Sequence, residues 1–318
     1  MSNKKLPTNI SSKYFDILSA KNKYAEGHNV SELLRAQKNI DFNTAEIIEI
    51  TYDLQAGTYV EIAEKNIESV SLYTGELANI ITNYIKSSDT LLDIGTGEIT
   101  TLSLLVRDLV IKPNHIFAFD VSWSRLYKGM QFACKNMGKC FDRFSPFVAD
   151  INEIPFLDKS INITTSSHAL EPNGAKLPEL MAELFRVTKD KVILFEPCYE
   201  INTEEGKKRM DQLGYIKGID TIVQNLGGNV IEKIKIKNIS NPLNPTVCFV
   251  IDPPQLDSSL KLNNCLIKTF TVPGSNHPLQ RVDDFYFSEV TGLCFPILKT
   301  IPILRSGAAI LASALQIN

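Results

Sequence analysis

Residues 91–97 read Leu91-Leu92-Asp93-Ile94-Gly95-Thr96-Gly97, an apolar run that ends in Asp-x-Gly-x-Gly and leads into a helical pattern. This order predicts a buried strand, a tight glycine turn and a helix. Glycine has no Cβ, so the backbone of such a turn lets a ligand approach closely. A dinucleotide site needs a third glycine for close helix packing, but Ile99 stands two positions beyond Gly97. The stretch predicts a Rossmann-like sheet and argues against a dinucleotide ligand.

After Thr90, short apolar or β-branched runs alternate with helical patterns, which is typical of a parallel sheet. We expect five parallel strands and then an antiparallel hairpin, whose turn is Asn241-Pro242-Leu243-Asn244-Pro245. The expected strands are 90–94, 115–119, 144–148, 161–165, 191–195, 231–236 and 246–251. The expected helices between them are 100–109, 124–135, 177–187 and a stretch near 207–226.

The amino-terminal 75 residues predict a helical cap. Asn43 is followed three positions later by Glu46, as in a capping box, and a second helix starts near Leu72. Pro253-Pro254 is a plausible linker near the other end. We expect three parts: a helical cap at 1–75, the α/β domain at 76–254, and a small α+β domain at 255–318.

The composition limits the classes of protein to which the chain can belong. It has 33 basic and 36 acidic residues and a net charge of -3, which argues against nucleic acid as a partner. The apolar stretch 295–317 is interrupted by Lys299, Pro302 and Arg305, so we expect no membrane span. The amino terminus lacks an apolar export core, and the six cysteines include no Cys-x-x-Cys pair. These features predict a cytoplasmic protein, and a homo-oligomer is compatible with them.

Two further acidic residues follow strands of the same sheet. Asp120 ends the second expected strand and precedes Val121, while Asp150 and Ile151 follow the third. The carboxyl ends of parallel strands meet at one edge, where nucleotide-like ligands bind. A carboxylate at Asp120 can accept both ribose hydroxyls, and Asp150 can accept an adenine amino group while Ile151 lies on the ring. The pattern predicts an adenosine-containing ligand.

Together these motifs resemble the class I S-adenosylmethionine-dependent methyltransferases, whose pattern runs Asp-x-Gly-x-Gly, Asp-x-Ser, Asp-x-x-x-x-Pro-Phe and His-x-Leu-Glu. All four occur here in this order, the last as His168-Ala169-Leu170-Glu171, and the resemblance covers about 72–252. It implies S-adenosyl-L-methionine as cofactor and Asp93 as a residue that positions its amino group. The implied cofactor-binding residues are Asp93, Gly95, Thr96, Gly97, Asp120, Val121, Asp150, Ile151, Ser166 and Ser167.

The chemistry of methyl transfer makes His168 and Glu171 the candidate catalytic residues. A hydroxyl or ammonium acceptor must lose a proton, and an imidazole titrates near neutral pH. His168 would be that base, and the alternative is that it only packs against the cofactor. Glu171 would orient the acceptor or simply start the next helix.

The carboxy-terminal segment 262–304 resembles the small zinc-ribbon-like subunits that bind and activate some tRNA and protein methyltransferases. The ligand positions of such a ribbon fall on Val272, Ser275, Ser288 and Thr291. None of these side chains is a thiolate or imidazole, so we expect no metal. Cys265, His277 and Cys294 offer no paired ligands either. The resemblance implies a fused partner that braces the catalytic domain.

We therefore expect a methyltransferase that acts on an O or N atom of a small molecule, such as a sugar or another metabolite. A tRNA or protein acceptor is the first alternative, favoured by the carboxy-terminal segment and disfavoured by the acidic balance. The second alternative is a scaffold that keeps the fold without catalysis.

Overall fold

The central element of the chain is a seven-stranded sheet in the order β3-β2-β1-β4-β5-β7-β6, seen in a computed structural model that describes residues 12–40, 42–255 and 270–317. The first five strands in that order are parallel, and β7 is antiparallel to both neighbours. This confirms the predicted Rossmann-like fold. The strands are β1 (Thr90–Ile94), β2 (His115–Asp120), β3 (Phe144–Val148), β4 (Ile161–Ser167), β5 (Thr188–Pro197), β6 (Asn229–Lys235) and β7 (Thr246–Asp252).

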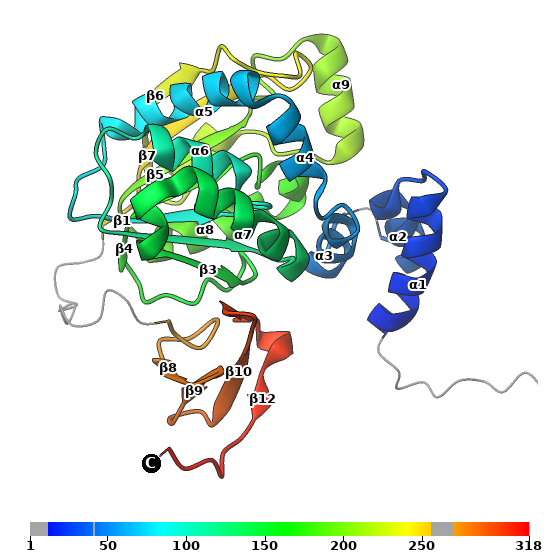
Figure 1. Cartoon of the computed structure of the whole chain (residues 1–318). Helices are drawn as coiled ribbons and strands as arrows, with labels where there is room; N and C mark the ends of the chain where they lie inside the picture. Colours follow the sequence, from blue (N-terminus) through cyan, green and yellow to red (C-terminus); the bar gives the residue numbers. More distant parts are fainter. Residues whose placement is uncertain (1–11, 41, 256–269, 318) are drawn as a thin grey trace, which may run out of the picture.

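Helices cover both faces of the sheet (Figure 1). Leu91 and Leu92 of β1 are fully buried in two different clusters, because successive strand residues point to opposite faces. The Leu91 cluster contains residues of α5 (Ile67–Thr82), α6 (Thr100–Asp108) and α7 (Trp123–Met137). The Leu92 cluster contains residues of α8 (Leu177–Val187) and α10 (Ile219–Asn225). The turns η1 (Gly138–Arg143) and η2 (Glu171–Lys176) precede β3 and α8.

The helical stretch expected at 207–226 is two helices, α9 (Glu204–Leu213) and α10. Gly214 follows α9 and Gly218 precedes α10, both with φ of +66°. The left-handed conformation at Gly214 ends α9, so the expected helical stretch is divided into two helices.

The helical cap comprises α1 (Ser12–Ala25), α2 (Val30–Lys38), α3 (Ala45–Asp53) and α4 (Thr58–Lys65). The N-cap of α3 is Thr44, whose hydroxyl accepts from the Ile47 N–H, and not Asn43 as the capping-box pattern indicated. The cap boundary expected at residue 75 falls inside α5. Within the described residues, no helix is long and apolar enough to cross a membrane.

The carboxy-terminal residues 270–317 form an antiparallel sheet with one 3-10 turn, η3 (Ser306–Ala308), instead of the expected α+β arrangement. Short connections join the strands of residues 270–317, and they leave no room for an α-helix between them. Its strands are β8 (Gln280–Val282), β9 (Phe285–Ser288), β10 (Leu293–Leu298), β11 (Ile301–Pro302) and β12 (Ile310–Leu311).

This small sheet, the tail sheet, docks on the edge strand β3, as Figure 1 shows below the main domain. The Leu304 N–H donates to the Val148 carbonyl at 2.8 Å. Phe270 packs against the rings of Phe147 and Phe156, with centroids 4.9 and 5.3 Å away. The tail sheet thereby covers an edge that would otherwise expose unpaired backbone groups.

Candidate active site

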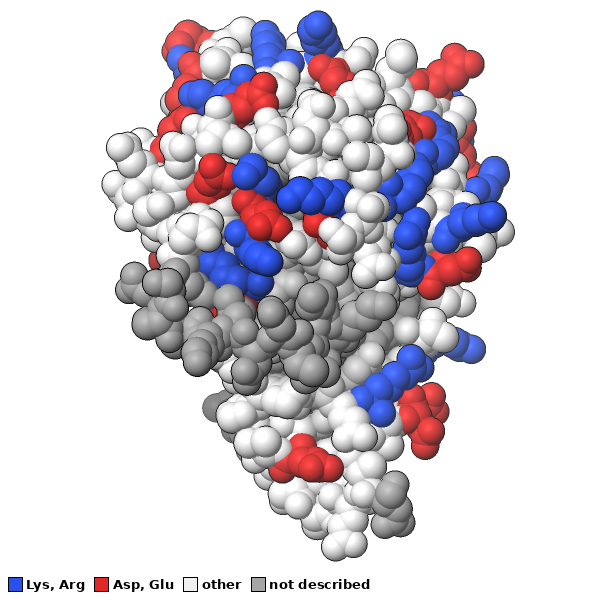
Figure 2. All heavy atoms as spheres, turned by 90° about the vertical axis from the view of Figure 1, so that its left-hand side faces the viewer, with Lys and Arg blue, Asp and Glu red and all other residues white. Residues whose placement is uncertain are grey.

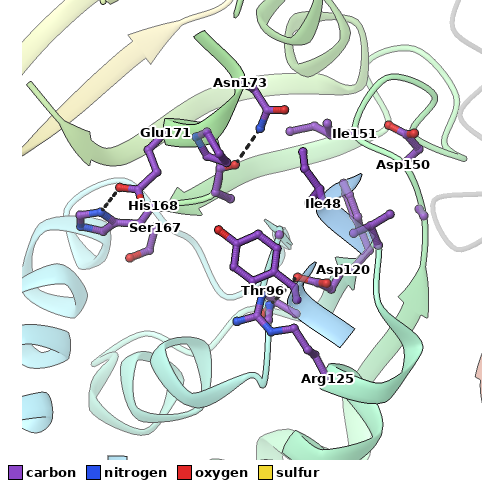
Figure 3. A pocket seen from close by; sticks show the side chains of 18 of the residues that line it. Ile48, Thr96, Asp120, Arg125, Asp150, Ile151, Ser167, His168, Glu171 and Asn173 are labelled. Atoms are coloured by element: carbon purple, nitrogen blue, oxygen red, sulfur yellow. Dashed lines mark hydrogen bonds and ion pairs between the residues drawn. The ribbon is translucent and has the colours of Figure 1, made fainter. Parts of the chain in front are cut away.

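A pocket lies at the carboxyl edge of β1, β2, β3 and β4, between the glycine turn and cap helices α3 and α4. Strand order reverses between β1 and β4, so this is the topological switch point of the sheet. Figure 3 shows this main pocket, with His168 and Ser167 at one end and Asp150 and Ile151 at the other. The predicted residues that line it are Gly95, Thr96, Gly97, Asp120, Val121, Asp150, Ile151, Ser167, His168 and Glu171.

Asp93 and Ser166 were expected at the cofactor but do not line the main pocket. The Thr165 hydroxyl donates to Asp93 Oδ1 at 2.9 Å, and burial raises the pKa of Asp93 to about 6. Ser166 is fully buried and donates to Glu196. Since side chains alternate along a strand, Ser167 faces the pocket and Ser166 faces away from it.

The glycine turn has no room for side chains. Gly95 and Gly97 have φ of +57° and +58°, a region that other residues rarely adopt. A Cβ on Gly95 would lie 2.4 Å from the Ala169 Cβ, and one on Gly97 would lie 2.3 Å from Arg125 Nη2. The turn requires glycine at both positions.

Asp120 is held in place by the backbone at the edge of the main pocket. Its Oδ2 accepts from the Gly97 N–H and its Oδ1 from the Ser122 N–H, both at 2.9 Å. A carboxylate oxygen can accept two hydrogen bonds, so each oxygen keeps one further site. The residue is 4% exposed and joins the second strand end to the glycine turn.

Arg125, Tyr52 and Tyr59 line the main pocket but were not predicted from the sequence. The Arg125 guanidinium lies 4.8 and 4.9 Å from the ring centroids of Tyr52 and Tyr59, and its Nη1 is 3.7 Å from Asp120 Oδ2. Its Nε is buried and has no partner. The sequence signal was weak, because Arg125 was only an arginine in the first turn of an expected helix.

Asp150 and Ile151 form the far end of the main pocket (Figure 3). Asp150 Oδ1 accepts from the Asn152 N–H at 2.9 Å and from Asn152 Nδ2 at 2.6 Å. These two bonds orient the carboxylate after β3. Ile151 is partly buried and packs against the main core, which leaves an apolar surface beside it.

His168 and Glu171 form a hydrogen-bonded dyad. His168 Nδ1 lies 2.8 Å from Glu171 Oε2, and His168 Nε2 lies 2.9 Å from the Thr246 hydroxyl. An ionised carboxylate can only accept, so Nδ1 carries the proton and the Nε2 of a neutral ring is the basic nitrogen. Burial disfavours the imidazolium, but Glu171 and the charge of Glu196 outweigh it and raise the pKa of His168.

Glu196 shapes the loop that carries His168. Its Oε1 accepts from the N–H groups of Ala169 and Leu170 at 3.1 and 3.0 Å. These two residues directly follow His168, whose φ of 59° is in the left-handed region. Its Oε2 is buried without a partner, and burial raises the pKa of Glu196 to about 7. The sequence showed this residue only as part of the fifth strand.

Glu98 connects the glycine turn to the cap. Its two carboxylate oxygens accept from the N–H groups of Gly57 at 2.9 Å and Val60 at 2.7 Å. These are the first-turn donors of α4, which has no side-chain cap of its own. Glu98 therefore holds Tyr59 of α4 over the main pocket.

The four tail-sheet residues at the positions of the zinc-ribbon ligands, Val272, Ser275, Ser288 and Thr291, form hydrogen bonds in two pairs. The Ser275 hydroxyl donates to the Val272 carbonyl at 3.0 Å, and the Thr291 N–H donates to the Ser288 hydroxyl at 3.4 Å. No three metal-binding side chains gather anywhere in the described ranges. Cys265 lies outside those ranges.

No known family and no curated protein matches this chain. One similar structure is a chain of the Haloferax volcanii complex between the Trm112 methyltransferase activator and a protein classed as a methyltransferase. It is 17% identical to this chain, with a TM-score of 0.48, and the match covers 63% of this chain and 97% of that one. The methyltransferase domain of bacterial CtHen1-C is 20% identical, with a TM-score of 0.44, over 58% of this chain and 98% of its own.

Geranyl diphosphate C-methyltransferase from Streptomyces coelicolor A3(2), in complex with S-adenosyl-L-homocysteine, is 11% identical with a TM-score of 0.43, over 56% of this chain and 78% of its own. These likenesses concern the fold. The function of this chain is therefore inferred from the residues that line its pocket.

Proposed function

We propose that this chain is an S-adenosyl-L-methionine-dependent methyltransferase that acts on an O or N atom of a small molecule. One observation carries the proposal: the glycine turn, Asp120 and Asp150 face one pocket that ends at the His168–Glu171 dyad. Those are the groups that an adenosyl ligand with a reactive sulfonium requires, in the order in which it would lie.

The donors and acceptors of the main pocket fit that cofactor. The free sites on the Asp120 oxygens can accept ribose hydroxyls, Asp150 can accept the adenine amino group, and Ile151 offers an apolar surface to the ring. Gly95 and Gly97 let the methionine part approach the backbone.

When bound, S-adenosylmethionine supplies an electrophilic methyl group, and the chain's residues do the rest. They exclude water, through Tyr52 and Tyr59, and they orient the acceptor. His168 accepts the acceptor's proton at Nε2, and Glu171 holds the ring in the required tautomer and stabilises its charge.

Isothermal titration with S-adenosylhomocysteine tests the proposal. We expect saturable binding at one site per chain, weakened about 10- to 100-fold in Asp120→Asn because a charge-assisted acceptor is lost. The exposed Asp142 provides the matched control, since Asp142→Asn should bind like the wild type. No binding by the wild type, or equal binding by Asp120→Asn, would refute the proposal. Binding without transfer to any acceptor would support the scaffold alternative.

Two other features support the proposed setting of the enzyme. The five described cysteines are unpaired, in keeping with a cytoplasmic location. The tail sheet covers β3 directly before Ala149 and Asp150 of the main pocket, in keeping with a bracing role for the carboxy-terminal domain.

A further inference from the structure

A second cavity, the side cavity, adjoins the main pocket at the dyad and encloses about 370 Å³. Small-molecule sites typically measure about 300–1,000 Å³, so this volume suits a metabolite. The two cavities share one wall, made by Tyr59, Thr100, Thr101, Ser167, His168 and Glu171. A molecule in the side cavity would therefore meet the reactive end of a ligand in the main pocket beside His168.

The charges around the side cavity exclude anions. Its lining, within the described residues, contains no Lys or Arg and carries charge only at His168 and Glu171. A phosphate or carboxylate would find no Lys or Arg there, would meet an imidazolium that is already paired with Glu171, and would be repelled by the Glu171 carboxylate. The face shown in Figure 2 carries both basic and acidic side chains.

One oxygen of the Glu171 carboxylate is already engaged by two side chains. Its Oε2 already accepts from His168 Nδ1 at 2.8 Å and from Asn244 Nδ2 at 3.1 Å. Because Asn244 Nδ2 must donate to this carboxylate, the other amide atom is the oxygen, and that oxygen is buried without a partner. That oxygen is not open to the cavity, whereas the neutral side chains of Ser240 and Asn241 line it and can hydrogen-bond to a hydroxyl group of an acceptor.

The remaining lining has one apolar and one neutral polar side. Ile62, Ala63 and Val70 come from α4 and α5, whereas the loop between β6 and β7 contributes mainly amides and hydroxyls. Glu76 accepts from the backbone N–H groups of Lys237 and Asn238, at 3.0 to 3.1 Å, and so anchors that loop to α5. The side cavity is preformed by these contacts.

We infer, on the basis of the proposed function, that the side cavity binds the methyl acceptor, and that this acceptor is an uncharged, hydroxyl-bearing small molecule with an apolar face. Its hydroxyl replaces the Thr246 hydroxyl as the donor to His168 Nε2 and loses its proton there, as its oxygen forms the bond to the methyl carbon and the carbon–sulfur bond of the sulfonium breaks. Nucleic acids, phosphorylated metabolites and carboxylates are excluded as acceptors.

The first experiment incubates the full chain with tritium-labelled S-adenosylmethionine and, separately, a small-molecule cell extract, bulk tRNA and extract protein. We expect label in a small product that passes through both anion and cation exchangers at neutral pH and is retained by a reverse-phase resin. Unreacted S-adenosylmethionine, a cation, is first identified in a control without enzyme; any enzyme-dependent product held by either ion exchanger, or enzyme-dependent label in tRNA or protein, overturns the inference. S-adenosylhomocysteine binding is measured in parallel, so its absence refutes the proposed function, whereas its presence with a charged product refutes only the acceptor class.

A second experiment decides the matter if no labelled product forms. Ile239→Cys places a thiol in the side cavity, and Val290→Cys is the control on an exposed position of the tail sheet. Each is treated with neutral, anionic and cationic methanethiosulfonate reagents, and the modified peptide is followed by mass spectrometry. Relative to the control, the anionic reagent should react about tenfold more slowly than the neutral one at Ile239→Cys. Equal or faster anionic modification, or a cationic rate more than about tenfold above the neutral rate, overturns the inference.

Discussion

Replacing Glu98 by alanine should release the first turn of α4 from the glycine turn. Glu98 is 1% exposed and accepts from both Gly57 and Val60, the two donors that a capping box would satisfy locally. Two hydrogen bonds to a charged acceptor are lost together. After allowance for water that reaches the freed N–H groups, the docking of α4 should weaken by about 2–4 kcal/mol.

Hydrogen exchange followed by mass spectrometry measures this effect locally. A loss of about 2–4 kcal/mol corresponds to exchange about 30- to 1,000-fold faster for the protected amides of residues 58–65. Affinity for S-adenosylhomocysteine should fall as well, because Tyr59 loses its fixed position over the main pocket. Glu98→Gln keeps one acceptor and should lie between the alanine variant and the wild type.

Glu64→Ala is the matched control, since Glu64 is an exposed glutamate on α4 itself. It should leave exchange within α4 and ligand affinity close to those of the wild type. If Glu98→Ala exchanges its α4 amides at the wild-type rate, Glu98 does not hold the cap, and the reasoning is refuted.

Three further predictions concern the dyad, the loop beneath it and the tail sheet. His168→Ala should lower kcat about 10²- to 10⁴-fold. In the wild type the rate should rise with pH as the His168 imidazolium loses its proton. Glu171→Gln should move that rise to lower pH, because Glu171 raises the pKa of His168. Initial rates across pH check both, and an unchanged profile removes His168 as the base. Glu196 has its pKa raised from 4.5 to about 7, so the stability it contributes is complete below pH 4.5 and is lost as pH rises through about 7. Urea unfolding at low and neutral pH should show Glu196→Gln gaining stability relative to the wild type over that interval, and a constant difference would contradict the raised pKa. The 2.6 Å ion pair of Arg305 and Glu49 links the tail sheet to α3, so a double-mutant cycle with alanine should give a coupling of about 0.5–1 kcal/mol, whereas additive effects would show that the pair contributes nothing.

The sheet could be predicted from the sequence because its central strands are buried on both faces. Such strands are mostly apolar runs, and β1 begins and ends where its run does. The glycine turn and the acids at Asp120 and Asp150 follow directly from those strand ends. The spacing of the strands therefore predicted that the glycine turn, Asp120 and Asp150 lie together, whereas Ser167, His168 and Glu171 were implied by the resemblance to a family.

The sequence was less informative about which side chains point into the main pocket. Positions 166 and 167 are both serine, but only Ser167 faces the main pocket, because successive side chains of β4 point to opposite faces of the sheet. Asp93 similarly ends beneath the glycine turn, bonded to Thr165. A one-residue difference in register would exchange the roles of the two serines.

Residues that act across elements were not predictable at all. Arg125 contacts Tyr52 and Tyr59, which reach it from the cap, and Glu98 accepts from the start of α4, which lies beside it. No local pattern encodes such contacts. The side cavity likewise joins α5 to the loop between β6 and β7, which are far apart in the chain.

A crystal structure with S-adenosylhomocysteine tests the central claim most directly. We predict ribose hydroxyls within hydrogen-bond distance of Asp120, the adenine beside Asp150 and Ile151, and the thioether sulfur directed toward His168 and the side cavity. A ligand bound elsewhere, or a main pocket that stays closed by Arg125 and the two tyrosines at saturating ligand, would contradict the account.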